Sequence, residues 1–162
     1  MTYAGRVEGY KRVDLAMRVV AQVQRILGVK VRFKIIGDGP MMDRVRGLAK
    51  ACGIELMHMG FLPRREYLRE LARSSAFINL SRYEAFSIVT AEALALGLPV
   101  VIAKPWGRIF ENYRAYVVDA EDINEVVKAL IKALTEPINV SAKIPTWTEV
   151  VREYMRKLYN SH

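Results

Sequence analysis

The sequence predicts an α/β protein with a mostly parallel, doubly wound sheet of about six strands flanked by helices. Short β-rich runs alternate along the chain with amphipathic helical stretches. The 162 residues suffice for one domain with a full core, and 52% hydrophobic with 26% charged residues is typical of a globular protein. Alternating strands and helices form right-handed crossovers, most commonly in the strand order 3-2-1-4-5-6. That order places a ligand crevice at the carboxyl ends of the first and fourth strands.

The strands are expected where runs rich in β-branched and aromatic residues lie between turn signals. The first run, MTYAG, has the character of the end of a strand. The predicted strands are 1–5, 31–37, 54–60, 76–81, 99–103 and 115–119.

The helices follow from apolar stripes and from their start and stop signals. The first is predicted over Arg12 to Leu27, with Gly28 as its stop. The GDGP turn then opens a second helix, with Pro40 at its first position and Asp38 or Gly39 as its cap. That helix ends near Cys52, and the later predicted helices are 63–74, 86–96, 121–136 and, after Thr146 or Thr148 as cap, 149–159. Residues 1–136 are expected to form the domain, and 137–162 a linker with a C-terminal helix.

The net charge of +8 and a pI near 9.7 favour anionic partners such as phosphates or nucleotides. The cations are spread along the chain without interleaved aromatics, so a nucleic-acid binder is only a minor alternative. One cysteine, Cys52, cannot form an internal disulfide, which favours a reducing compartment, and we expect a cytoplasmic protein. The opening residues lack a secretory signal, and the apolar runs are too short to span a bilayer.

The loop after the first strand, GRVEGYK, has the composition of an anion site. Arg6 and Lys11 lie beside a helix N-terminus, and Gly5 and Gly9 let the backbone approach a ligand. The alternative is a surface loop whose cations are solvated or pair with Glu8 or Asp14.

The loop after the fourth strand, SRYEAFS, and the helix behind it supply two carboxylates, Glu84 and Glu92. A carboxylate can accept hydrogen bonds from two neighbouring hydroxyls, as on a ribose or hexose ring. From the residues alone, Glu84 is best interpreted as an exposed loop or capping acid. Glu92 lies among apolar neighbours and requires a partner, either a ligand or an arginine such as Arg82 or Arg6.

A family resemblance rests on three segments: GRVEGYKRVD, FKIIGDGP and MGFLPRREYLRELARSSAFINLSRYEAFSIVTAEALALGLPVV. They resemble the C-terminal domain of GT-B glycosyltransferases of the "glycosyl transferases group 1" type, which includes retaining, nucleotide-sugar-dependent enzymes. The family pattern reads GR…KG.D, GDGP, GF and S.YE.FG….EA.A.G.PV, and it covers residues 3–136 here. The resemblance implies a Rossmann-like domain that is one half of a GT-B fold.

The resemblance also implies roles. Arg6 and Lys11 would contact the donor diphosphate and stabilise the departing nucleoside diphosphate, and Glu84 would bind the transferred sugar. Glu92 would bind the ribose hydroxyls. Backbone amides at Phe86 and Ser87 would meet the sugar or the distal phosphate. The remaining expected donor-site residues are Gly5, Gly37, Gly60, Phe61, Leu62 and Ile88, of which Gly37 and 60–62 would line the base pocket. No cofactor and no divalent metal are expected, because the two cations neutralise the diphosphate; the sequence has no DxD motif, and His58 and His162 lack a partner at ligand spacing.

Two departures from the pattern stand out. Ser87 occupies the position of the family glycine after Phe, and we expect a modest adjustment there. The stretch after the fifth strand, AKPWGRIFENYRAYVVDAED, lacks the usual Gly-Gly…Glu loop, although Gly107 and Glu111 are present.

The full enzyme is expected to move a hexose from a nucleoside-diphosphate sugar to an acceptor hydroxyl, with an N-terminal acceptor-binding domain that this chain lacks. Alone, the chain would bind the donor and transfer little. The last helix would pack toward that missing domain, and its apolar stripe could drive self-association. The alternatives are a non-catalytic nucleotide or phosphosugar-binding module, sugar-nucleotide epimerase chemistry, and the nucleic-acid binder.

Overall fold

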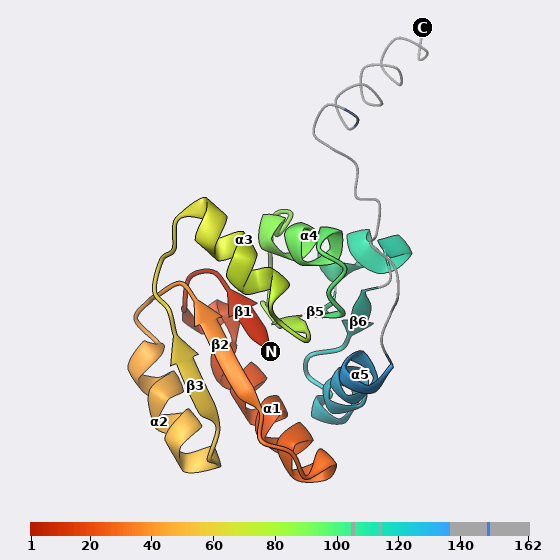
Figure 1. Ribbon diagram of the computed structural model, residues 1–162. Helices are drawn as coiled ribbons and strands as arrows, with labels where there is room; N and C mark the ends of the chain where they lie inside the picture. Colours follow the sequence, from red (N-terminus) through yellow and green to blue (C-terminus); the bar gives the residue numbers. More distant parts are fainter. Residues whose placement is uncertain (105, 114, 137–148, 150–162) are drawn as a thin grey trace, which may run out of the picture.

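The computed structural model describes residues 1–104, 106–113, 115–136 and 149, and in it the strands form one six-stranded parallel sheet (Figure 1). The strand order is β3-β2-β1-β4-β5-β6, so the predicted order and the doubly wound α/β fold are confirmed. The strands are β1 (Thr2–Ala4), β2 (Arg32–Ile36), β3 (Glu55–His58), β4 (Phe77–Asn79), β5 (Val100–Ala103) and β6 (Tyr116–Val118).

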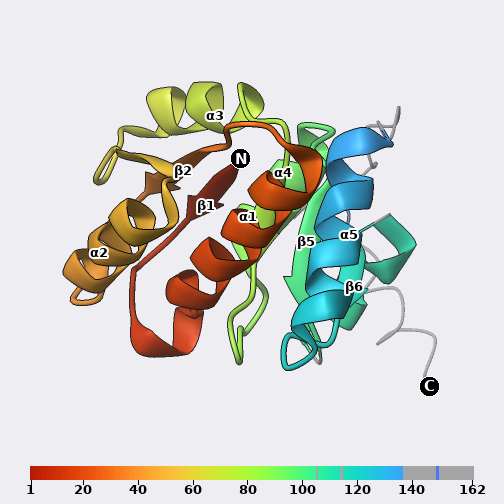
Figure 2. The same cartoon turned by 90° about the horizontal axis from the view of Figure 1, so that it is seen from below.

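Helices cover both faces of the sheet, as Figures 1 and 2 show together. The α-helices are α1 (Val13–Leu27), α2 (Met42–Cys52), α3 (Arg64–Ala72), α4 (Ile88–Ala95) and α5 (Ile123–Thr135). Two 3₁₀ helices, η1 (Gly9–Lys11) and η2 (Trp106–Tyr113), lie in the loops after β1 and β5. Buried residues of α1, α2 and α5 form one core cluster with the sheet, and those of α3, α4 and η2 form another. Successive strand residues alternate between the two clusters: Ile35 and Ile78 belong to the first, Ile36 and Phe77 to the second.

Helix α5 begins at Ile123 and not at residue 121, and helices α2 and α4 also begin two residues later than predicted, for reasons that lie at the carboxyl edge of the sheet. Helix α2 begins at Met42 and not at Pro40, because the GDGP turn bonds to the loop after β1: the Val7 amide donates to the Asp38 carbonyl, and the Met41 amide donates to the Val7 carbonyl. Helix α4 begins at Ile88, because Ser87 has a left-handed backbone that cannot belong to the helix. The differences at α2 and α4 lie in the region where the sequence predicts the site.

The predicted linker and last helix, and with them the self-association hypothesis, lie outside the described residues apart from Glu149. Within the described part of the chain, no helix is long and apolar enough to cross a membrane.

Candidate donor-binding site

The loops after β1 and β4 meet at the carboxyl edge of the sheet, where the winding direction changes. Lys11 Nζ lies 2.7 Å from Glu84 Oε1, and the two side chains are only 14% and 12% exposed. The Arg82 amide donates to the Tyr10 carbonyl at 2.9 Å, and the rings of Tyr10 and Tyr83 stack with centroids 4.8 Å apart. Chain topology therefore joins a cation and a carboxylate 73 residues apart into one partly buried pair.

Glu84 is held by two donors that converge on a single carboxylate oxygen. Its Oε1 accepts from Lys11 Nζ and from Asn79 Nδ2 at 3.1 Å, and Ser81 Oγ lies 3.0 Å away with its one proton nearer to Asn79 Oδ1. Across the described residues, no donor reaches Oε2. The interpretation of Glu84 as an exposed loop or capping acid is therefore wrong: Glu84 is a fixed, largely buried group whose hydrogen bonds within the described residues all go to one carboxylate oxygen.

Ser87, the predicted departure from the family glycine, has φ 57° and ψ 72° and is 7% exposed. An L-residue in this left-handed region is destabilised by about 1–2 kcal/mol. The Ser87 hydroxyl offsets this strain, because it accepts from Asn79 Nδ2 at 3.2 Å and bonds to Thr90 Oγ1 at 2.7 Å. The adjustment expected at this position is therefore a strained backbone held by a buried side-chain network.

Glu92 projects from α4 toward α3, and its side chain is 14% exposed. Its Oε1 pairs with Arg64 and its Oε2 accepts from Tyr67 Oη at 2.6 Å. Burial and this hydrogen bond raise the pKa of Tyr67, so the phenol remains a donor at neutral pH. The prediction that Arg82 or Arg6 pairs with Glu92 is wrong, because the arginine partner is Arg64 of helix α3.

Arg6 is the most solvated of the predicted cations, with a side chain 66% exposed. Its Nε lies 2.5 Å from Glu8 Oε1, which is one of the alternatives that the sequence left open, whereas Asp14 pairs with Arg44 at 3.0 Å. The Tyr3 hydroxyl donates to the Arg6 carbonyl at 2.7 Å and fixes the backbone beneath the side chain. Burial, and next to it the negative charge of Glu84, raise the pKa of Tyr3.

The glycines on this edge bring three loops into backbone contact. Gly5 and Gly37 both have positive φ, and a Cβ on Gly37 would lie 2.1 Å from the Gly5 carbonyl oxygen. The Gly37 amide donates to the Gly60 carbonyl at 2.7 Å. The chain segments after β1, β2 and β3 therefore pack as closely as backbone allows, and only glycine fits at Gly37.

The remaining predicted donor-site residues lie around this edge but differ in exposure. Phe61 is 72% exposed and Ile88 55% exposed, whereas Leu62 packs against the core beside α3 and α4. Phe86 is 41% exposed and makes a tilted ring contact with Phe110 of η2 at 5.7 Å.

Three residues of the site were not predicted from the sequence. Arg12, 9% exposed with φ 51°, donates from Nε to the Leu80 carbonyl at 2.8 Å and pairs with Glu121. Arg12 stands where the family pattern KG.D has glycine, and that departure was the available signal. Asn79 holds the loop from below, and Trp106 of η2 donates to the Ser81 carbonyl at 2.7 Å. The unusual stretch after β5 therefore contacts the site through Trp106, while Gly107 is buried and Glu111 exposed.

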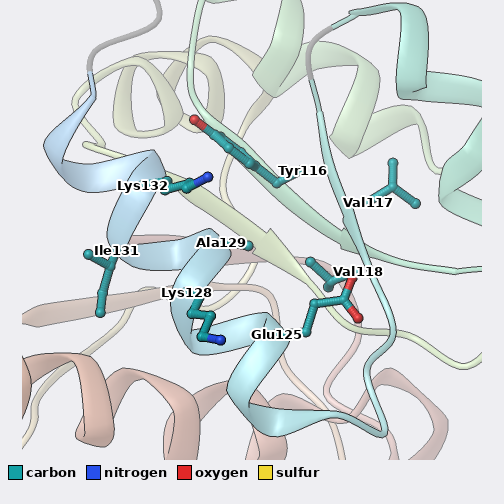
Figure 3. A pocket seen from close by; sticks show the side chains of 8 residues that line it. All are labelled: Tyr116, Val117, Val118, Glu125, Lys128, Ala129, Ile131 and Lys132. Carbon is teal, nitrogen blue, oxygen red and sulfur yellow. The ribbon is translucent and has the colours of Figure 1, made fainter.

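No cluster of three potential metal ligands occurs among the described residues. His58 lies between Arg46, at 2.9 Å from Nδ1, and the Gly37 carbonyl, at 3.0 Å from Nε2. A cavity of about 540 Å³ lies elsewhere, between β6 and α5, and no predicted site residue lines it (Figure 3). The site is thus an open edge of the sheet and not this cavity.

The chain is a doubly wound α/β protein whose loops after β1 and β4 meet at one edge of the sheet, and the family follows from the comparison of sequences. The chain belongs to the family "Glycosyl transferases group 1", whose profile matches residues 1–146. A D-inositol 3-phosphate glycosyltransferase of Rhodococcus erythropolis is 28% identical over 170 aligned positions, which cover 92% of this chain and 37% of the relative. The chain therefore spans 37% of the length of this curated relative.

Solved structures place the chain in the GT-B fold. TarM of S. aureus, in a complex whose ligands include UDP and alpha-GlcNAc-glycerol, superposes with a TM-score of 0.80 at 20% identity, over 98% of this chain and 35% of that one. The lipopolysaccharide outer core galactosyltransferase WaaB gives a TM-score of 0.80 at 16% identity, over 99% of this chain and 49% of that one. At 20% and 16% identity, the similarity to these two structures establishes the fold of the chain and nothing further.

Proposed function

We propose that this chain is the donor-binding domain of a retaining glycosyltransferase that moves a hexose from a nucleoside-diphosphate sugar to an acceptor hydroxyl. The observation that supports this most is the Lys11–Glu84 pair, with its 2.7 Å contact at the carboxyl edge of the sheet. A cation suited to a diphosphate and a carboxylate suited to sugar hydroxyls lie side by side. In a nucleotide sugar, the diphosphate and the hexose are likewise neighbours.

Lys11 has the larger part in the proposed chemistry. When the bond between the anomeric carbon and the diphosphate breaks, negative charge grows on the diphosphate, and a cation already in place stabilises it. Arg6 can join Lys11, because its exposed pair with Glu8 contributes only about 0–1 kcal/mol and is easily exchanged for a phosphate. These two cations supply the positive charge, and no metal is proposed.

Glu84 and Glu92 would orient the donor at its two sugar ends. The Oε2 of Glu84 can accept from a hexose hydroxyl while Oε1 stays fixed by Lys11 and Asn79. At Glu92, ribose hydroxyls would displace Arg64, whose side chain is 64% exposed, while Tyr67 keeps the other oxygen. Placement of both sugars before the reaction lowers the entropy loss in the transition state.

In the proposed retaining transfer, the acceptor oxygen forms its bond to the anomeric carbon on the face that the diphosphate leaves. The proton of the acceptor hydroxyl passes to the leaving phosphate oxygen. The acceptor itself would bind to an N-terminal domain of the whole enzyme, so this chain alone is expected to bind the donor and to transfer little.

Calorimetric titration of the chain with UDP, GDP, ADP and their hexose conjugates tests the proposal, with and without a chelator. Saturable binding of one nucleotide is expected, unchanged by the chelator. Lys11→Ala should weaken it about 10- to 100-fold, since a hydrogen bond to a charged group contributes about 1.5–3 kcal/mol. Lys30→Ala is the matched control, because Lys30 is exposed in the turn between α1 and β2. If folded protein binds none of these compounds, or if both alanine variants behave alike, the donor-site proposal fails.

A second candidate is a non-catalytic nucleotide-binding module. The observation behind it is η2, which replaces the expected glycine-rich loop and puts Trp106 against the site loop. The two candidates differ in the hexose: a donor site binds the hexose conjugate more tightly than the free nucleoside diphosphate, whereas a nucleotide module binds both alike.

A further inference from the structure

Beside Lys11 and Glu84 lies a buried amide, Asn79, whose side-chain hydrogen bonds within the described part of the chain all go to the loop that carries the site. Asn79 ends β4 and is 1% exposed. Its Nδ2 donates to Glu84 Oε1 at 3.1 Å and to Ser87 Oγ at 3.2 Å. Its Oδ1 accepts from the Ser81 amide at 3.1 Å and from Ser81 Oγ at 2.6 Å. One side chain therefore holds the beginning, middle and end of the loop 81–87.

The orientation of this amide follows from the chain itself. The Ser81 backbone N–H can only donate, so the side-chain oxygen of Asn79 must face it. The NH₂ group then faces Glu84 and Ser87, where both of its protons are used. Two donors and two accepted bonds exhaust the hydrogen-bonding capacity of an amide. Asn79 therefore has nothing left for a ligand and can act only through its neighbours.

The hydrogen bonds that Asn79 donates fix the geometry of two neighbours, Glu84 and Ser87. The bond to Glu84 helps to fix Oε1, so the carboxylate presents Oε2 in one direction. The bond to Ser87 helps to hold a left-handed backbone, with φ 57°, at the residue that precedes α4. Ser81, which is 0% exposed, anchors the amide from the other side.

We propose that Asn79 is a positioning residue that holds Glu84 and Ser87 in the geometry needed for the hexose of the donor. The inference rests on the proposed function, because it assigns Asn79 to the sugar end of that site. Lys11, to which the diphosphate is assigned, bonds to Glu84 and not to Asn79, so a change at Asn79 should affect sugar recognition more than nucleotide binding.

Two dissociation constants test this, one for the nucleoside diphosphate that the wild type binds and one for its hexose conjugate. Asn79→Ala should reduce the affinity gain from the hexose about 10-fold and change nucleoside diphosphate binding less than about 3-fold. In a Glu84→Gln background, Asn79→Ala should have little further effect on that gain. Asn124→Ala, at an exposed position of α5, is the matched control.

An equal loss of affinity for both ligands would mean that Asn79 is merely structural, and an unchanged hexose gain would overturn the inference. A urea-denaturation cycle needs no nucleotide: Asn79→Ala and Ser87→Ala should each lower the midpoint, and together by less than the sum. If the midpoint shifts of the two single variants add up to that of the double variant, Asn79 does not position Ser87, even if the wild type binds the donor. If the wild type binds no nucleotide while the cycle shows coupling, the proposed function fails and the contact between Asn79 and Ser87 stands.

Discussion

Substitution of Ser87 separates the backbone strain at this residue from its hydrogen bonds. Ser87→Ala keeps the Cβ, and with it the strain at φ 57°, but removes the bonds to Asn79 and Thr90. Thr90 is 0% exposed, so its hydroxyl loses a buried partner. A buried polar group left unsatisfied costs about 1–3 kcal/mol, and we expect Ser87→Ala to lower the free energy of unfolding by about 2 kcal/mol.

Ser87→Gly removes the same bonds and also the strain. Relief of a left-handed L-residue contributes about 1–2 kcal/mol, and the greater freedom of glycine in the unfolded chain takes back about 0.4–1 kcal/mol. The glycine variant should therefore be about 1 kcal/mol more stable than the alanine variant and still less stable than the wild type.

Equilibrium urea unfolding of the whole chain, followed by circular dichroism, measures the three free energies. The wild type should be most stable, then Ser87→Gly, then Ser87→Ala, with similar slopes. If the alanine variant is as stable as the glycine variant, the strain argument is wrong. If it is as stable as the wild type, the hydrogen bonds contribute nothing.

Three further predictions concern the loops and the opposite edge of the sheet. Gly37→Ala should unfold the protein or destabilise it by more than about 4 kcal/mol, because its Cβ would lie 2.1 Å from the Gly5 carbonyl oxygen, whereas Gly9→Ala, with no atom within 4 Å of its Cβ, should change thermal stability little. Arg12→Gly should be more stable to urea than Arg12→Ala by about 1 kcal/mol, since both lose the same bonds but only glycine relieves the positive φ; equal stabilities would contradict this. Lys34 of β2 donates to Glu70 and lowers the pKa of that carboxyl group below its ordinary value of 4.5. Ionised Glu70 therefore stabilises the fold above about pH 4.5, and this contribution is lost as the pH falls through the pKa in the folded state. Urea midpoints from neutral pH downward should fall less steeply for Glu70→Gln than for the wild type, and parallel curves would refute the assignment.

The sheet could be predicted from the sequence because its evidence is local. Apolar periodicity, the spacing of turns and the general rule for crossovers were enough for all six strands and their order. The starts of α2 and α4 could not be predicted, since they depend on backbone contacts across the edge, such as the Met41 amide on the Val7 carbonyl. Helix signals such as Pro40 state where a helix can begin, and the tertiary contact decides where it does.

The candidate site was predictable in its location but not in its pairings. Topology alone placed Lys11 and Glu84 at one edge. Glu92 bonds to Arg64 and Tyr67. Both partners belong to α3 and precede Glu92 in the sequence, by 28 and 25 residues. Their approach is set by the packing of α3 beside α4 on one face of the sheet, and no spacing rule along the chain contains it.

Arg12 and Ser87 show why a departure from a family pattern does not reveal its own consequence. Both stand at glycine positions of the pattern, and they are the two non-glycine residues with positive φ among the described residues. A substitution at such a position would ordinarily be interpreted as decay of the site, because a Cβ strains the left-handed backbone. Here each new side chain is buried and bonds to β4 or the residue after it, Arg12 to the Leu80 carbonyl and Ser87 to Asn79. Each substitution that introduces strain thus also supplies a bond that holds its loop, and the left-handed geometry is kept without glycine.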